Sequence, residues 1–245
     1  IVTGACLSGV GNNVTCFDVD KKKIDLLKNK QTTLYEPNLT KIINESLKNN
    51  NLKFSSNIKE TIINNDVIFL TVGTPQKSTG ECNLTYIHNA ANNIGKYIND
   101  YKLIIVKSTV PVGSTLNIKK LIEKNVSQRK KIIDFDIANN PEFLKQGKAV
   151  NDFMSPDRII IGLSNDKLKQ TFIDLYRPFS INHQKLIFMD VRSSELTKYA
   201  SNVMLATKIS FINEFAIIAD KLGADINNIR LGIGSDSRIG YEYIY

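Results

Sequence analysis

Short apolar runs alternate with segments of helical periodicity along the first 190 residues. Apolar runs of strand length predict strands at Val14–Val19, Val67–Val72, Leu103–Lys107, Asp134–Ala138, Arg158–Leu163 and Leu186–Asp190. Apolar residues at helical spacing predict intervening helices that include Asn38–Asn49, Leu84–Ile98 and Ser114–Lys124. This alternation is typical of an α/β domain with a mainly parallel sheet that is wound right-handedly.

The pattern changes after Asp190. No Pro or Gly occurs from Ser194 to Leu222, and apolar residues recur there at helical spacing, which predicts one long helix. Ser193 or Ser194 can cap its start, and Gly223 stands where a glycine commonly ends a helix. Such a length indicates a helix that bridges two domains or two subunits. We therefore expect three parts: a domain over residues 1–190, a long helix over 191–223, and the start of a second domain over 224–245.

The composition indicates a soluble globular protein, with 42% hydrophobic and 23% charged residues. The net charge of +8 raises nucleic-acid binding as a possibility, but the basic groups Lys21–Lys23 and Arg129–Lys131 are not interleaved with aromatic residues. No uninterrupted apolar run reaches the roughly 20 residues of a membrane helix, and the chain does not begin like a signal peptide. We expect a cytoplasmic protein with neither a nucleic-acid nor a membrane partner.

Neither the cysteines nor the histidines suggest a metal site. Cys6, Cys16 and Cys82 form no CxxC pair, and His88 and His183 are far apart. Cys6 and Cys16 lie in apolar stretches and are expected to be buried as small hydrophobic residues.

Mainly parallel sheets often bind dinucleotides at the carboxyl ends of their strands, where a GxGxxG loop follows the first strand. No such motif is present. Gly9 and Gly11 come closest, but Val14 stands where the third glycine is needed, and this segment precedes a strand. We interpret Gly9–Gly11 as the end of a helix that turns into a strand.

A later part of the dinucleotide fingerprint is present. Asp18 ends the strand that begins at Val14, where a carboxylate accepts hydrogen bonds from the adenosine ribose and favours NAD over NADP. The alternative is an ordinary turn aspartate. If Asp18 has the first role, the first strand and the phosphate-binding loop are expected to precede Ile1.

Seven segments form an ordered series across the chain: Ile1–Leu7, Tyr35–Pro37, Val72–Pro75, Lys107–Gly113, Asn140–Leu144, Ser194–Asn202 and Gly234–Gly240. In this order they resemble motifs of the UDP-glucose/GDP-mannose dehydrogenase family, and most closely those of the bacterial UDP-glucose 6-dehydrogenases. The resemblance implies a Rossmann-like NAD-binding domain, a long central helix through which two subunits form a homodimer, and the start of a UDP-sugar-binding region.

The resemblance also implies an activity, the NAD-dependent oxidation of UDP-glucose to UDP-glucuronate in two hydride transfers. A cysteine thiolate captures the intermediate aldehyde, and the resulting thioester is hydrolysed. Covalent capture is needed because a free aldehyde could escape between the two transfers.

The resemblance assigns catalytic roles to Thr109, Glu142, Lys198 and Asn202. Glu142 acts as a general base through water in thioester hydrolysis, and Thr109 helps to hold that water beside the nicotinamide. Lys198 and Asn202 are four residues apart and share one helix face. There the lysine can stabilise a developing oxyanion, and the asparagine can hold a substrate oxygen or a water.

The remaining implied contacts are with the cofactor and the sugar nucleotide. The expected cofactor-binding residues are Asp18, Lys23, Thr74, Thr109 and Gln146. The expected substrate-binding residues are Glu142, Phe143, Leu144, Lys198, Asn202 and Arg238. Arg238 resembles an arginine that reaches into the sugar-nucleotide site of a neighbouring subunit, where a guanidinium suits an anionic ligand.

Two departures from the family pattern matter. Gln146 stands where relatives commonly have glutamate, so the side chain keeps its hydrogen-bonding capacity but loses its charge. The family's Gly-Gly-Ser-Cys-Phe segment is expected beyond Tyr245, and none of Cys6, Cys16 and Cys82 aligns with it. The 245-residue chain is therefore expected to be inactive by itself.

Two alternatives stay open at this point. The first is a dehydrogenase for another nucleotide sugar, such as UDP-N-acetylmannosamine or GDP-mannose. The second is a non-catalytic gene fragment that retains only partner binding through the long helix. The coding region on both sides of this segment would separate an enzyme from a relic.

Overall fold

The computed structural model describes residues 1–32, 34–180 and 185–244. The chain divides into two compact units, Ile1–Glu195 and Leu196–Tyr245, and each is described by itself. His183 lies outside the described residues.

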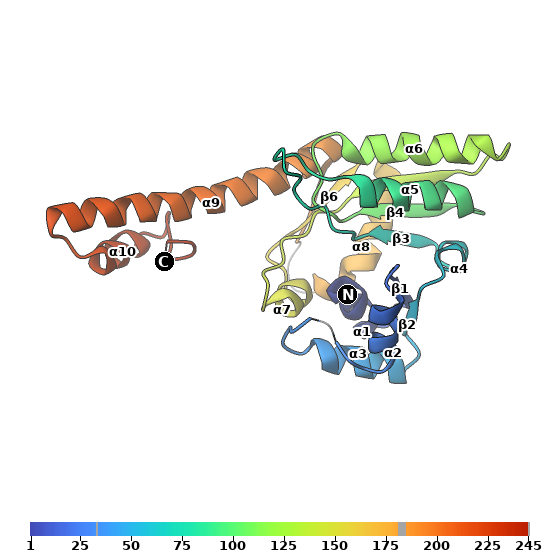
Figure 1. Ribbon diagram of the computed structural model, residues 1–245, viewed down its shortest axis with the longest axis horizontal. Helices are drawn as coiled ribbons and strands as arrows, with labels where there is room; N and C mark the ends of the chain where they lie inside the picture. Colours follow the sequence, from blue (N-terminus) through green and yellow to red (C-terminus); the bar gives the residue numbers. More distant parts are fainter. Residues whose placement is uncertain (33, 181–184, 245) are drawn as a thin grey trace. The chain divides into compact units, whose positions relative to one another are not determined.

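The first unit is built from alternating strands and helices (Figure 1). Its strands are β1 (Val14–Phe17), β2 (Leu52–Ser55), β3 (Val67–Leu70), β4 (Lys102–Val106), β5 (Phe135–Asn139), β6 (Ile159–Leu163) and β7 (Leu186–Asp190). Its α-helices are α1 (Val2–Gly9), α2 (Lys21–Lys28), α3 (Leu39–Lys48), α4 (Ile58–Ile63), α5 (Thr85–Tyr97), α6 (Ser114–Gln128), α7 (Ala149–Met154) and α8 (Lys169–Tyr176). Two 3₁₀ turns, η1 (Asp166–Leu168) and η2 (Arg177–Phe179), flank α8.

The strands form two sheets. β1 and β2 pair in parallel, and β3-β4-β5-β6-β7 form a five-stranded sheet in that order. All pairs of the larger sheet are parallel except β5–β6, which is antiparallel. This confirms the prediction of an α/β fold with a mainly parallel sheet.

β4 lies at the centre of both hydrophobic cores, and all five of its residues are buried. Leu103 and Ile105 belong to a core shared with α1, α3, α7 and α8, whereas Ile104 and Val106 belong to a core shared with α5 and α6. Figure 1 shows α5 and α6 together on one side of the larger sheet. Alternation between two covered faces explains why β4 is an uninterrupted apolar run in the sequence.

The end of α1 agrees with the sequence interpretation, whereas β2 was not predicted. α1 ends at Gly9, and Gly11 then takes a φ of +99°, so the interpretation of Gly9–Gly11 as a helix end before a strand is confirmed. β2 has only two apolar residues, Leu52 and Phe54, in its Leu-Lys-Phe-Ser sequence, which is too weak a pattern to give a signal.

The long helix α9 spans Val191–Leu222 and begins earlier than predicted. Its start is capped by Asp190, whose Oδ1 accepts a hydrogen bond from the Ser193 N–H at 3.0 Å, so the prediction of a Ser193 or Ser194 cap is wrong. Hydrogen bonds from Ser193 hold the pKa of Asp190 below its ordinary value. The Ser194 hydroxyl instead donates to Asn139 Oδ1 at 2.6 Å, on the last residue of β5.

The end of α9 agrees with the sequence. Gly223 takes a left-handed φ of +68°, and the Ala224 N–H donates to the Ala219 carbonyl at 2.9 Å. This six-to-one hydrogen bond is the one that defines a Schellman ending.

The second unit contains the rest of α9 and the short helix α10 (Ile226–Gly234). Side chains tie its C-terminal segment to these helices. Lys208 Nζ donates to the Ile239 carbonyl at 3.0 Å, and Arg230 Nε donates to the Ile244 carbonyl at 2.6 Å.

Gly162 on β6 permits close approach by the first turn of α9. A Cβ atom at Gly162 would lie 2.6 Å from the Ser194 Cβ and 3.0 Å from the Val191 Cα. We predict that Gly162→Ala destabilises the chain by about 1–3 kcal/mol through overpacking. Gly73→Ala is the matched control, because no atom lies within 4 Å of a Cβ there. Equilibrium urea unfolding measures both, and equal midpoints for the two variants would contradict the prediction.

Candidate functional site

The carboxyl ends of β3, β4 and β5 meet at one edge of the larger sheet, because these three strands are parallel. The residues that follow them line a cavity of about 450 Å³. The cavity wall includes five of the predicted site residues: Thr74, Thr109, Glu142, Leu144 and Gln146. The structure therefore brings together residues that are up to 72 positions apart in the sequence (146 minus 74).

The N-terminus of α1 forms another part of the cavity wall through Ile1, Val2 and Thr3. The first N–H groups of a helix have no partners within the helix, and the helix dipole favours negative charge at this end. A helix start beside the carboxyl ends of parallel strands is the arrangement that binds pyrophosphate in dinucleotide-binding domains.

Hydrogen bonds hold the loops after β3 and β4 together. The Thr74 hydroxyl donates to the Thr109 carbonyl at 2.8 Å. The Ser108 hydroxyl lies 2.7 Å from the Val72 carbonyl and 3.2 Å from the Leu70 carbonyl. These side-chain bonds satisfy carbonyls at the point where the strand pairing ends.

The loop that carries Gln146 is fixed by a distant carboxylate. Glu36 is 5% exposed. Its Oε1 accepts from the Gly147 N–H at 2.7 Å, and its Oε2 accepts from the Ala149 N–H at 3.1 Å. Ala149 is the first residue of α7, so Glu36 satisfies a helix start and anchors the cavity wall with one side chain.

A second buried carboxylate joins the start of α9 to α6. Glu195 is 2% exposed, and it accepts from the Gly113 N–H at 2.5 Å and the Thr115 N–H at 2.8 Å. It thereby caps α6, whose own cap residue is Gly113 and has no side chain to do so. Neither Glu36 nor Glu195 was given a role from the sequence. Both fall within the motifs that resemble the family, but a single sequence does not show that they bond so far away.

Behind the cavity, Asn140 is 2% exposed and joins three elements. Its Oδ1 accepts from Lys107 Nζ at 3.3 Å and from the Tyr176 hydroxyl, and its Nδ2 donates to the Ile160 carbonyl at 2.9 Å. Lys107 also lines the cavity and lies 5.6 Å from the centre of the Phe153 ring. Lys107 was not predicted as a site residue, although a lysine that ends an apolar strand at this edge of the sheet is a usable signal.

Asp18 and Lys23 lie apart from the cavity wall, at the end of β1 and in α2. Lys23 Nζ is 2.5 Å from Asp18 Oδ2. Partial burial opposes the charged form of Asp18, but hydrogen bonds from Lys23 and the Asp20 N–H hold its pKa below the ordinary value. Asp20 has a different task, because its Oδ1 accepts from the Lys22 and Lys23 N–H groups and caps α2.

Phe143 lies outside the cavity wall, unlike its neighbours Glu142 and Leu144. Its ring packs against Arg158, whose guanidinium carbon is 4.4 Å from the ring centre. This distance is that of a cation–π contact.

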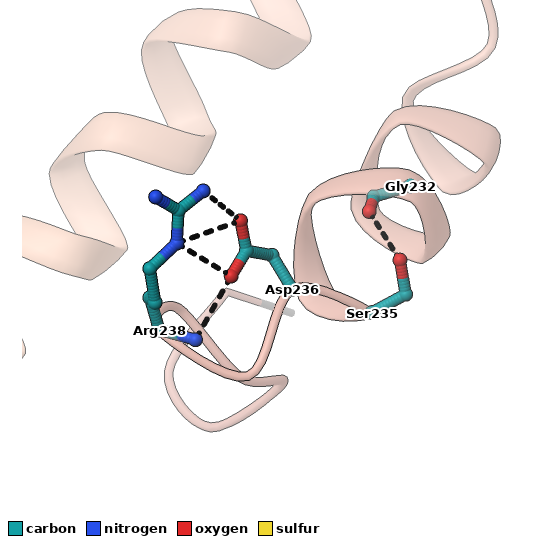
Figure 2. A network of polar contacts seen from close by, with 4 residues as sticks. All are labelled: Gly232, Ser235, Asp236 and Arg238. Atoms are coloured by element: carbon teal, nitrogen blue, oxygen red, sulfur yellow. Dashed lines mark hydrogen bonds and ion pairs between the residues drawn. The ribbon is translucent and has the colours of Figure 1, made fainter.

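Lys198, Asn202 and Arg238 belong to the second unit. Lys198 and Asn202 lie one turn apart on α9, as predicted from their spacing. Arg238 forms a paired contact with Asp236 (Figure 2): its Nε is 3.0 Å from Asp236 Oδ1, and its Nη2 is 2.5 Å from Oδ2. The Arg238 N–H also donates to Asp236 Oδ1 at 2.9 Å. These hydrogen bonds lower the pKa of Asp236 and raise that of Arg238.

The cysteines do not provide a thiolate to the cavity wall. Cys6 is fully buried, and burial raises its pKa to about 12. Burial also raises the pKa of Cys16. Cys82 Sγ lies 3.8 Å from the Thr74 carbonyl but is not among the residues that line the cavity. Within residues 1–32, 34–180 and 185–244, no cluster of His, Cys, Asp and Glu could hold a metal ion.

The parallel strand ends, the helix start at the cavity and the acidic residue after β1 are the features of a dinucleotide-binding domain. The chain belongs to the UDP-glucose/GDP-mannose dehydrogenase family. Residues 1–180 match the NAD binding domain of that family, and residues 192–245 match its central domain.

Relatives and solved structures agree with this assignment. The chain is 42% identical over 244 residues to the UDP-glucose 6-dehydrogenase of Rickettsia bellii, covering 100% of this chain and 55% of the relative. It is 40% identical to UDP-glucose 6-dehydrogenase TuaD of Bacillus subtilis, covering 100% of this chain and 52% of the relative. The chain thus spans about half the length of the curated relatives it matches.

Two solved structures have the same fold over nearly the whole chain. A UDP-glucose dehydrogenase from the archaeon Pyrobaculum islandicum has a TM-score of 0.91 at 34% identity and covers 99% of this chain and 56% of that one. A GDP-mannose dehydrogenase from Pseudomonas aeruginosa has a TM-score of 0.90 at 31% identity and covers 96% of this chain and 54% of that one.

Proposed function

We propose that this chain forms the NAD site and part of the catalytic site of a UDP-glucose 6-dehydrogenase, which oxidises UDP-glucose to UDP-glucuronate. The observation that carries the proposal is the cavity in which Thr74, Thr109, Glu142 and Gln146 gather beside the start of α1. The cavity combines hydroxyls, the carboxylates of Glu36 and Glu142, and a helix start, which suit a nicotinamide and a reacting hydroxyl or water.

In this proposal, NAD would supply the hydride acceptor, with a fresh NAD for each of the two transfers, and the residues of the chain orient the reactants and handle protons. Glu142 takes a proton from the water that hydrolyses the thioester. Thr109 holds that water next to the nicotinamide. Lys198 stabilises the oxyanion that develops on the sugar, and Asn202 holds a substrate oxygen or a water. Arg238 binds the anionic nucleotide sugar of a neighbouring subunit.

We propose that a strand and a phosphate-binding loop complete the NAD site from a segment that precedes Ile1. In the described part of the chain, β1 pairs only with β2, and β3 pairs only with β4. A parallel strand between β1 and β3 would join the two sheets in the strand order of dinucleotide-binding domains. Such a strand would lead directly into α1, with its loop at the start of that helix.

The identity of the sugar is a further part of the proposal. UDP-glucose is favoured because the curated relatives at 40% and 42% identity are named as UDP-glucose 6-dehydrogenases. The likeness to a GDP-mannose dehydrogenase at 31% identity keeps GDP-mannose as the second candidate. Turnover with the two nucleotide sugars at equal concentration would separate them.

The first functional prediction concerns cofactor choice, in a chain that includes the phosphate-binding segment. We expect Asp18→Ala to weaken NADH binding about tenfold to a hundredfold, the usual loss when a hydrogen bond to a charged group is removed. Asp20→Ala is the matched control. It should lower the stability of α2 by about 1 kcal/mol and leave NADH affinity within about twofold. Fluorescence titration measures affinity, and equal affinities of the unsubstituted protein for NADH and NADPH would contradict this assignment.

The second prediction concerns the 245-residue chain by itself. We expect no steady UDP-glucose-dependent NADH production. The sequence contains no GxGxxG loop, and burial keeps Cys6 and Cys16 protonated. The measurement is absorbance of NADH with saturating NAD and UDP-glucose. Steady turnover would show that the reaction uses residues other than those proposed.

The positive control is the same chain extended at both ends with the segments of a relative. It should produce NADH. Glu142→Gln in that extended protein should slow thioester hydrolysis, so that a covalent sugar adduct becomes visible by intact-protein mass spectrometry. Rapid thioester hydrolysis in this variant would contradict the proposed role of Glu142 as general base.

We also propose that two chains associate through α9. Met204, Phe211, Phe215, Ile218 and Leu222 follow one another at intervals of seven, four, three and four residues, and all are exposed, from 38% at Phe215 to 77% at Leu222. This spacing puts them on one face of the helix. The Phe211 and Phe215 rings already pair, with centres 4.6 Å apart. An apolar stripe of this kind commonly marks a protein or membrane contact.

By length and composition alone, α9 could also cross a membrane, as the core helices of soluble proteins sometimes could. We predict a dimer at micromolar concentration in sedimentation velocity. Phe215→Glu should yield monomers, and Asn213→Glu should not, because Asn213 is exposed on the opposite side of the helix. A monomeric unsubstituted chain would contradict dimerisation, and pelleting with phospholipid vesicles would assign the stripe to a membrane instead.

A further inference from the structure

We propose that Tyr176 and Lys107 are positioning residues for Glu142 and that they act through the side chain of Asn140. The inference depends on the proposed function only for the role given to Glu142. Tyr176 is far from Glu142 in the sequence and does not line the cavity.

Glu142 is a half-buried residue of the cavity wall. Within the described residues, no hydrogen bond or ion pair reaches its side chain. The position of Glu142 therefore depends on the backbone that leads to it. Pro141 restricts that backbone at one residue, and Asn140 is the nearest preceding residue whose side chain is anchored.

Asn140 is anchored at four points. Its backbone N–H donates to the Val106 carbonyl at 2.9 Å, which extends the pairing of β4 with β5 by one residue. Its Nδ2 donates to Ile160 on β6, and its Oδ1 accepts from Lys107 and Tyr176. Two donors face Asn140 Oδ1 and one acceptor faces its Nδ2. A 180° flip of the side-chain amide would therefore place donor against donor and acceptor against acceptor. The turn from Asn140 to Glu142 is thus fixed at its start.

Tyr176 is suited to this task at any physiological pH. It is 2% exposed at the end of α8, and burial raises its pKa far above the ordinary value, so the phenol stays protonated and donates. Its ring packs against the Phe179 ring, with the ring centres 6.0 Å apart, and this contact fixes the direction of the hydroxyl. Removal of this hydroxyl takes one hydrogen bond from the Asn140 side chain and removes no residue of the cavity wall.

The test compares Tyr176→Phe with Tyr101→Phe in the 245-residue chain. Tyr101 is a matched control because its hydroxyl donates to Asp136 Oδ2 at 2.9 Å, near the opposite end of the same strand β5. Two signals are followed by NMR. The first is hydrogen exchange of the Asn140 backbone N–H, and the second is the carboxyl ¹³C resonance of Glu142, which is assigned by its loss in Glu142→Gln.

We expect Tyr176→Phe to accelerate exchange of the Asn140 amide about threefold to tenfold, the size of one lost hydrogen bond. It should also shift and broaden the Glu142 resonance. Tyr101→Phe should change neither signal. A Glu142 resonance unchanged in Tyr176→Phe, or an equal change in Tyr101→Phe, would overturn the proposal.

Lys107 is tested separately by the Asn140 amide alone, because loss of a charge from the cavity wall could move the Glu142 resonance directly. Lys107→Met should accelerate exchange of the Asn140 backbone N–H. Lys107→Arg should keep that exchange slow, because arginine supplies another donor. Slow exchange in Lys107→Met would remove Lys107 from the proposal. No readout uses cofactor or substrate, so a failure of the proposed function would leave these results interpretable.

Discussion

Strands that end inside a protein leave backbone groups that need hydrogen-bond partners, and the candidate site depends on how this requirement is met. After β3, β4 and β5 the partners are buried side chains. Ser108 donates to the Val72 carbonyl in the loop after β3, Asn140 joins β4 to β6, and Glu36 accepts from N–H groups just before and at the start of α7. Each of these bonds fixes a loop that carries a residue of the cavity wall. The geometry of the cavity is therefore set by polar groups that surround it.

Two buried carboxylates also satisfy backbone groups in this way. Glu36 and Glu195 each accept two backbone N–H groups, and each does so at least 80 positions away in the sequence. Charged acceptors bind such groups more strongly than neutral ones, and both side chains are almost fully buried. Glu36 holds the loop with Gln146 against the rest of the first unit, and Glu195 holds the first turn of α9 against α6. The catalytic candidates Thr109 and Glu142 are left free to face the cavity.

The sequence predicted the fold class because the strands of the larger sheet are apolar on both faces and the helices between them are regular. It also predicted that the loops after β3, β4 and β5 lie together, since the carboxyl ends of neighbouring parallel strands must meet. β2 escaped prediction because only Leu52 and Phe54 of its four residues are apolar, whereas the equally short β3 is apolar throughout. The cap of α9 was misassigned because Asp190 and the two serines are all good caps, and only packing of Ser194 against Asn139 decides among them. One hydrogen-bond network joins Asn140 to Lys107 and Tyr176, which are 33 and 36 positions away in the sequence. Periodicity along the chain does not reveal contacts over such separations.

The pairing of Arg238 with Asp236 has a consequence for ligand selectivity. The guanidinium is 87% exposed but presents its Nε and Nη2 edge to a carboxylate two residues away. An incoming anion must either share the guanidinium with that carboxylate or displace it. A singly charged anion gains little from such an exchange, whereas a doubly charged diphosphate gains more. Because the pair is exposed, salt also weakens it. In its proposed binding role, Arg238 would therefore select ligands by charge as well as by shape, with a dependence on ionic strength.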